Sequence, residues 1–265
     1  MLKRFAVAAV ACLFACMAPA HAYDYTDVYF SPNEPGWGVF LVQSDTTQFL
    51  AFFIYDSSNK PVWYTAQLTL QSSGAYTGPL VATTGSYFAG DWNPSQLTVN
   101  AAAGTATFAP IDRYRATLTY QVNGAPAVTK TIRRQTLTSQ NLTGPYDGAI
   151  FATTTNCADP SQNDPEGGHY YVNMSNAQSG EQAAALNITF RQTNWVCRIE
   201  GPLTHFGRLY KMTDANFSCT GAGAPSATTV TVNGLHPTAE GLEGHINGRI
   251  NNCDFDGGFT VVRSN

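Results

Sequence analysis

The chain has 265 residues, of which 12% are charged, and its formal net charge is −4 at pH 7. This charged fraction is roughly half of that in an average soluble protein, so hydroxyl and amide groups are expected to cover much of the surface. The negative net charge argues against nucleic-acid binding, because contacts with phosphates need Lys and Arg clustered on one face. Such a composition is common among exported β-proteins.

The first 22 residues combine two basic residues, a short apolar run and an Ala-x-Ala site. This pattern predicts a secretory signal peptide over residues 1–22, with Tyr23 as the first mature residue. The alternative is a lipoprotein signal with the lipid on Cys16, because "LFAC" resembles a lipoprotein processing box. No apolar run in the chain reaches the roughly 20 residues of a membrane helix. We therefore expect a secreted or periplasmic protein without a transmembrane segment.

Residues 23–135 form a Trp-rich half without cysteine. The runs "WGVFLVQ", "QFLAFFIYD" and "PVWYTAQLTL" are rich in β-branched and aromatic residues, and the hairpin-length turns "SDTT" and "SSNK" separate them. Further runs raise the number of strands to seven or eight, at the spacing of a sandwich or an up-and-down barrel. We predict one small antiparallel β domain over this half.

The polar segment 136–144 is predicted to be a linker, since it lies just before a Gly-Pro turn signal. Residues 145–265 contain nine further strand-like runs, and no window shows a convincing helical period. The chain is therefore predicted to be all-β, with two small antiparallel β domains, each a barrel or a sandwich, and disulfides in the second.

Four cysteines remain after residues 1–22, and all of them lie in the second half of the chain. An even number of cysteines in an exported chain predicts two disulfides, for which three pairings are possible. A zinc site is the weaker alternative, because no pair has Cys-x-x-Cys spacing and no His follows or precedes one of them. No cofactor is expected. The four residues are Cys157, Cys197, Cys219 and Cys253.

The segments "PNEPGWGVFLVQ", "FFIYDSSNKPVWYTAQL" and "LTYQVNGAPAVTKTIRRQ" together resemble a family of exported β-domain proteins of proteobacteria. The shared pattern reads Pro-x-Glu-x-Gly-Trp-Gly, then Tyr-Asp, then Pro-x-Trp-Tyr, and it covers about residues 30–135. The cysteine-bearing half resembles a module that often accompanies this family. The resemblance implies bacterial origin, export and a β-fold, and it transfers no catalytic residue.

Aromatic side chains are the main candidates for a binding surface, because their faces stack on sugar rings and Tyr or Trp adds a hydrogen-bonding group. For Trp37 we favour a core position over a ligand platform, since the strand after it is apolar on both faces and is expected to be buried on both. In the "PVWY" hairpin we expect Trp63 in the core and Tyr64 exposed beside Tyr55. The predicted binding residues are Glu34, Trp37, Tyr55, Tyr64 and Trp92.

Other polar candidates have structural explanations that we favour. Asp56 begins a turn and is expected to cap backbone amides rather than to act in catalysis. The acidic loop 159–168 offers oxygen donors of the type that calcium prefers, but it lacks EF-hand order, so a solvated turn is favoured. No H-E-x-x-H or Gly-x-Ser-x-Gly motif occurs.

Three functions of different classes fit this sequence. The favoured one is a non-catalytic binding or interaction protein that recognises carbohydrate or another cell-surface component. The second is a small-molecule carrier with an apolar barrel interior, which a cavity of several hundred Å³ would support. The third is a hydrolase whose residues converge only in space, which a cleft with His and carboxylates would support.

Overall fold

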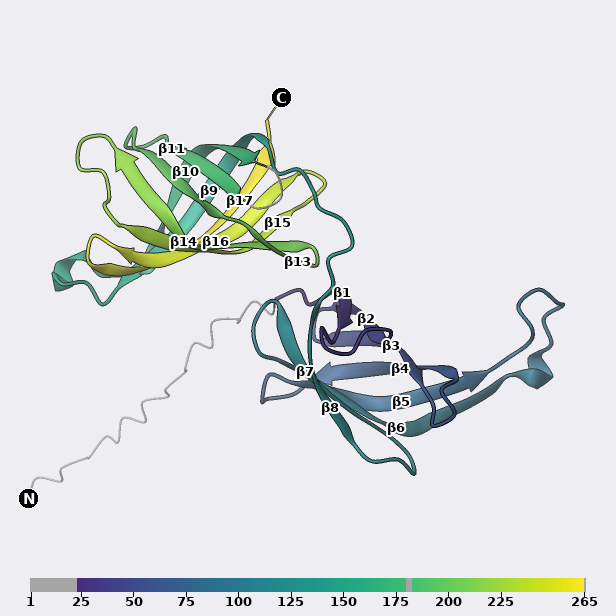
Figure 1. Ribbon diagram of the computed structural model, residues 1–265. Coiled ribbons are helices and arrows are strands. Elements are labelled where there is room, and N and C mark those ends of the chain that lie inside the picture. Colours follow the sequence, from purple (N-terminus) through teal and green to yellow (C-terminus); the bar gives the residue numbers. More distant parts are fainter. Residues whose placement is uncertain (1–22, 180–182, 265) are drawn as a thin grey trace, which may run out of the picture.

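The computed structural model describes residues 23–179 and 183–264 and contains two antiparallel β-sheets that follow one another along the chain (Figure 1). Both sheets curl into barrels, so the prediction of an all-β fold with two small antiparallel units is confirmed. Besides the strands, these described residues include two single-turn 3₁₀ helices, η1 (Pro94–Gln96) and η2 (Pro160–Gln162). The predicted signal peptide and Cys16 lie outside the described residues.

The first barrel is an eight-stranded meander in which each strand pairs with the next. It closes where β1 pairs with β8, with Tyr29 opposite Arg134. Its strands are β1 (Asp27–Phe30), β2 (Gly38–Ser44), β3 (Thr47–Tyr55), β4 (Pro61–Leu70), β5 (Tyr76–Thr84), β6 (Thr98–Pro110), β7 (Arg115–Val122) and β8 (Val128–Arg134).

The second barrel is the nine-stranded sheet in the order β12-β11-β10-β9-β17-β16-β15-β14-β13. An additional pairing of β12 with β14 brings its two sides together, with Cys197 opposite Cys219. Its strands are β9 (Gly144–Thr155), β10 (Asp164–Ser179), β11 (Ala183–Phe190), β12 (Val196–Pro202), β13 (Thr204–Phe206), β14 (Leu209–Thr220), β15 (Thr229–Pro237), β16 (Gly241–Ile250) and β17 (Cys253–Arg263).

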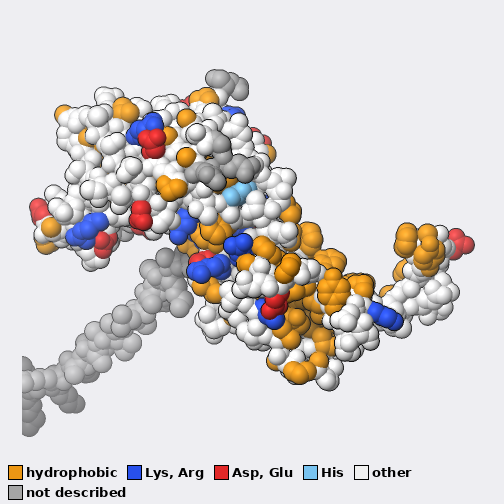
Figure 2. Space-filling model, in the orientation of Figure 1, with side chains coloured by type: hydrophobic (Ala, Val, Ile, Leu, Met, Phe, Trp, Pro, Cys, Tyr) orange, Lys and Arg blue, Asp and Glu red, His pale blue; other side chains and the backbone are white. Residues whose placement is uncertain are grey.

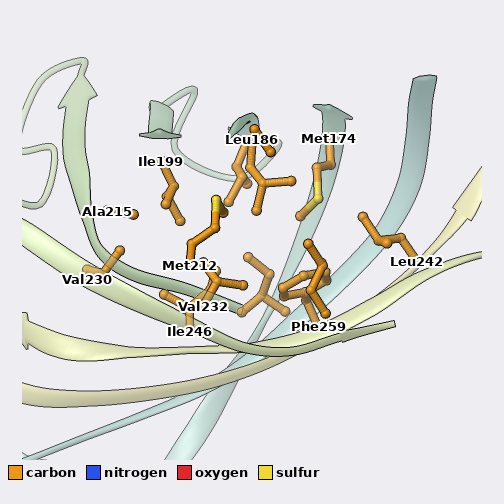
Figure 3. Packing of buried hydrophobic residues seen from close by; sticks show 14 of the residues in the cluster. Met174, Leu186, Ile199, Met212, Ala215, Val230, Val232, Leu242, Ile246 and Phe259 are labelled. Atoms are coloured by element: carbon orange, nitrogen blue, oxygen red, sulfur yellow. The ribbon is translucent and has the colours of Figure 1, made fainter. Parts of the chain in front are cut away.

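Alternation along each strand sends every second side chain into a barrel interior. In the first barrel the interior contains large rings, and the Tyr29 hydroxyl donates to the Tyr25 carbonyl at 2.9 Å. Burial, the largest influence, raises the pKa of Tyr25 to about 12. Figure 3 shows side chains from opposite sides of the second barrel, among them Leu186 and Val232, directed into one shared interior.

Both disulfides predicted for the second half are present, and the structure pairs Cys157 with Cys253 and Cys197 with Cys219. They are consistent with an oxidising, extracytoplasmic environment. Within residues 23–179 and 183–264, no helix has the length and apolar character needed to span a bilayer.

The two barrels meet around a buried ion pair. Arg134 and Asp27, whose side chains are 0% and 4% exposed, lie 3.0 Å apart. The tip of the β13–β14 hairpin reaches this pair, because the Arg208 backbone N–H donates to the same Asp27 oxygen at 3.0 Å. Gly207 at this tip has φ +61°, and a Cβ there would overlap the Asp27 carboxylate, so this position requires glycine.

Two predictions about side-chain direction are wrong. The strand after Trp37 is not buried on both faces, because Phe40 on the outer side of β2 is 51% exposed. In β4 the orientation is the reverse of the prediction, since Trp63 is 53% exposed and Tyr64 is half-buried against the core. The physical reason is that closing a meander into a barrel leaves its outer face without a second layer, so apolar residues remain there.

Candidate functional site

The second barrel contains a cavity of about 320 Å³ at one end. Its inner wall consists of small and branched apolar side chains from four strands, and these residues are almost completely buried. Half-buried rings surround its outer part. The apolar lining residues are Ile150, Ala152, Tyr170, Ile188, Phe190, Trp195, Cys197, Ile199, Phe217, Pro225, Ile246, Ile250, Cys253 and Phe255.

Covalent and hydrogen bonds hold the segments around this cavity. The Cys157–Cys253 disulfide joins the β9–β10 loop to the start of β17, and the second disulfide joins β12 to β14 across the closing seam. The Trp195 indole Nε1 donates to the Ala222 carbonyl at 3.0 Å, which fixes the 221–228 loop beside the cavity. The cavity wall is therefore built from segments that cannot separate easily.

Four polar residues complete the lining, and most of their hydrogen bonds involve the backbone. The Thr154 hydroxyl donates to the Gln162 carbonyl at 2.9 Å. Asp164 Oδ1 accepts from the Gly167 N–H at 2.9 Å, and Asn251 Oδ1 accepts from the Ser226 N–H at 2.8 Å. Among these lining residues Asp164 is the only one with a charge. The site is thus an apolar chamber with a few polar groups.

The predicted candidates Glu34, Trp37 and Tyr55 lie together on the first barrel. Trp37, for which a core position was predicted, is half-buried against the core cluster, and its Nε1 donates to Glu34 Oε2 at 3.3 Å. Glu34 also accepts from Lys130 at 2.7 Å, and this hydrogen bond lowers the pKa of Glu34 below its ordinary value. The Tyr55 hydroxyl donates to the Gly36 carbonyl at 3.0 Å. These contacts fix the 33–37 loop on the end of the barrel.

The outer face of β2, β3 and β4 carries a continuous apolar surface, which we call the aromatic face (Figure 2). Phe53 lies directly opposite Trp63 on the neighbouring strand, and each is 53% exposed. Phe53 also contacts Phe40 edge to face, with ring centroids 6.1 Å apart. Half exposure of rings of this size leaves roughly 75–125 Å² of each in contact with water. The members are Phe40, Val42, Phe49, Phe53, Tyr55 and Trp63.

Trp92 belongs to the connection between β5 and β6, two strands that extend as an arm beyond the barrel (Figure 1). Two further exposed rings are near it in sequence, Tyr87 and Phe88, with centroids 5.0 Å apart. Ser86 Oγ accepts from the Asn93 N–H at 2.7 Å and closes the loop. The structure therefore does not bring Trp92 into one site with Trp37, Tyr55 and Tyr64.

The polar candidates behave as structural groups. Asp56 Oδ1 accepts from the N–H groups of Ser58 and Lys60 at 2.8 and 3.0 Å, so the predicted cap is confirmed. In the acidic loop, Asp159 Oδ1 accepts from the Ser161 N–H at 2.9 Å and caps η2. Within the described residues, no group of three or more His, Cys, Asp and Glu side chains is placed to hold a metal ion.

A polar cleft between the barrels contains the pair His245 and Asp256, whose Nδ1 and Oδ1 lie 2.9 Å apart. Among the described residues that line this cleft there is no Ser or Cys. The aliphatic hydroxyl of this lining is that of Thr231, so the pair has no Ser or Cys nucleophile beside it among the described lining residues.

Sequence reasoning did not identify the residues of the cavity. They come from seven strands and four connecting segments, and those in the strands occupy ordinary positions of the alternating pattern. The usable signal was weak: the buried residues of the lining are mainly Ile, whereas the buried cluster of the first barrel includes five Tyr and Phe rings. Comparisons with protein-family models, with curated proteins and with solved structures found no match.

Proposed function

We propose that the protein is an exported, non-catalytic binding protein whose second barrel takes up a small, mainly apolar ligand. The cavity of about 320 Å³ is the observation that supports this function. Ligand sites typically measure roughly 300–1,000 Å³ and combine apolar walls with a few polar groups. A barrel of about eight strands has the width to enclose one such molecule.

The position of the disulfides fits a binding protein that works outside the cytoplasm. Both flank the cavity, since Cys197 and Cys253 are among its lining residues. A wall that is covalently closed loses little conformational freedom when a ligand enters, so less binding energy is spent on ordering it. We place the protein in the secreted or periplasmic space, where such disulfides persist.

A neutral fluorescent dye that responds to apolar surroundings, such as N-phenyl-1-naphthylamine, tests this function. The dye should bind the intact protein at one site, and Ile199→Phe should weaken binding at least about tenfold, because the added atoms occupy the cavity. Ile111→Phe makes the same change at an exposed position of the first barrel and should leave the affinity unchanged. Equal dye binding by a folded Ile199→Phe protein would contradict the proposal.

A second candidate function is recognition of carbohydrate or another cell-surface component by the aromatic face. Its support is the directly paired, half-exposed Phe53 and Trp63, since sugar rings stack on such faces. Exposed apolar patches of roughly 300–600 Å² are also often functional. On this interpretation Trp63, and not Tyr64, is the exposed ring of the "PVWY" hairpin that contacts the ligand.

A glycan array with the intact protein tests the second candidate. Trp63→Ala should abolish any signal and leave the fold intact, because the ring is largely outside the core. Tyr171→Ala, which removes an exposed ring from the second barrel, is the matched control and should retain the signal. An array without signal would remove this candidate and leave the cavity proposal unaffected.

A further inference from the structure

The charges around the cavity restrict the ligands that it can accept. Asp164 is the only charged residue among those that line the cavity, and none of these described residues is Lys, Arg or His. A ligand with a carboxylate head, such as a fatty acid, would bring a second negative charge towards Asp164 with no counter-ion in the lining. Asp164 itself is exposed at the mouth of the cavity, so the two like charges would repel each other with no cation in the lining to compensate, and such a ligand is disfavoured.

Asp164 also has capacity for a further partner. Two hydrogen bonds hold it at the start of β10, one from the Gly167 N–H to Oδ1 and one from its own N–H to the Thr154 hydroxyl. No ion pair joins Asp164 to another side chain in the described part of the chain. A carboxylate can accept several hydrogen bonds, so Asp164 can receive the head group of a bound molecule.

Five half-buried aromatic side chains line the cavity and pack against the apolar core. The Phe190 ring lies between two others, with centroids 6.0 Å from Tyr170 and 6.2 Å from Trp195, both edge to face. Aromatic faces attract organic cations, most strongly where water is excluded. The lining therefore combines a carboxylate and several rings, which are the two groups that recognise ammonium ions. The five rings are those of Tyr170, Phe190, Trp195, Phe217 and Phe255.

We infer that the cavity selects a small organic amine, in which an apolar body fills the chamber and a protonated nitrogen is held by Asp164 and the surrounding rings. This inference rests on the proposed function, because it names the ligand class for the same cavity. The volume of about 320 Å³ is near the lower end for ligand sites, which restricts the apolar body to one or two rings.

Three compounds that share a naphthalene ring and differ in their head group separate the preference for a head group from binding of the apolar ring. They are 2-(1-naphthyl)ethylamine, 2-(1-naphthyl)ethanol and 1-naphthylacetate, each titrated at pH 7 as a competitor of the bound dye. The amine is expected to bind at least about tenfold more tightly than the alcohol, and the carboxylate more weakly than the alcohol. Asp164→Asn should reduce the affinity for the amine to that for the alcohol and leave the alcohol unchanged. Glu166→Gln removes a nearby acid that is not in the lining and should change none of the three.

The outcomes of these titrations test the preference for an amine separately from the proposed binding of an apolar ligand. If the alcohol binds but the amine shows no advantage, or if Asp164→Asn retains that advantage, the inference is wrong and the proposal of an apolar site stands. If the carboxylate binds as tightly as the amine, the charge argument is wrong. If neither the dye nor any of the three compounds binds, the proposed function fails, and the inference fails with it.

Discussion

Replacing Arg134 by Met is expected to destabilise the protein by about 4 kcal/mol. The guanidinium donates to the Asp27 carboxylate and also to the backbone carbonyls of Asp24, Thr26 and Arg113, at distances of 2.6–3.2 Å. Removing one partner of a buried pair leaves the other charge without compensation, which typically costs roughly 3–5 kcal/mol. Met retains the volume of the Arg stem, so most of the loss is electrostatic and not a cavity effect.

The neighbouring residue supplies a matched control. Arg133 is exposed and its guanidinium lies over the Phe30 ring at 5.2 Å, so Arg133→Met should cost less than about 1 kcal/mol. The double variant Asp27→Asn with Arg134→Met removes both charges. It should be more stable than Arg134→Met alone, because no uncompensated charge remains in the interior.

Urea denaturation of the intact protein, followed by Trp fluorescence, measures these differences. Three of the four Trp residues are in the first barrel, at positions 37, 63 and 92, so the signal reports mainly on the barrel that contains the pair. Midpoints are compared only where the slope of the transition is unchanged. The reasoning is refuted if Arg134→Met costs no more than Arg133→Met, or if the double variant is less stable than the single one.

Three further predictions follow from particular contacts. Tyr64→Ala should lower the free energy of unfolding by roughly 2 kcal/mol and Trp63→Ala by less than about 1 kcal/mol, because only Tyr64 packs against the core. Urea denaturation measures both values, and a larger loss for Trp63→Ala would contradict the structure. Alkylation under denaturing, non-reducing conditions should label no cysteine, and two labelled thiols would exclude the observed pairing. Burial raises the pKa of Asp24, but hydrogen bonds from Thr26 and Arg208 outweigh it, so the pKa lies below its ordinary value of 3.8. The stability that Asp24 adds is therefore complete above that value and is lost as pH falls below it. Thermal melts between pH 5 and 2 should show that the melting temperature of Arg208→Met falls less with pH than that of the unchanged protein.

The strand pattern was readable from the sequence because it depends on local chemistry. Turn clusters such as "SDTT" and "SSNK" mark the β2–β3 and β3–β4 hairpins, and β-branched and aromatic runs mark the strands. The disulfide pairing was not readable, because it depends on which strands close the second barrel. Cys197 and Cys219 are adjacent only through the β12–β14 pairing.

Side-chain direction in the "PVWY" hairpin was predicted wrongly for a similar reason. Alternation establishes that Trp63 and Tyr64 point to opposite sides, but it does not say which side is the interior. An exposed cross-strand pair of Tyr64 with Tyr55 was expected, which left Trp63 for the core, whereas the register places Tyr64 opposite Phe52, which is completely buried. The inward side was therefore decided by the pairing of neighbouring strands and not by the larger ring.

The two barrels share a strand pattern, yet they differ in how their interiors are filled, and this difference determines where a ligand can bind. In the first barrel, five buried rings, those of Tyr25, Tyr29, Phe52, Tyr76 and Phe108, occupy the interior. In the second, the buried rings Tyr146, Tyr210 and Phe259 are not part of the cavity lining, and the buried inner wall of the cavity is built mainly from Ile, while the rings of its lining are only half-buried. Because the interior of a barrel of about eight strands is only just wide enough for side chains to fill it, replacing rings by Ile and Ala leaves space for a small molecule. Binding capacity therefore follows from side-chain size at inward positions, which the strand pattern alone does not report.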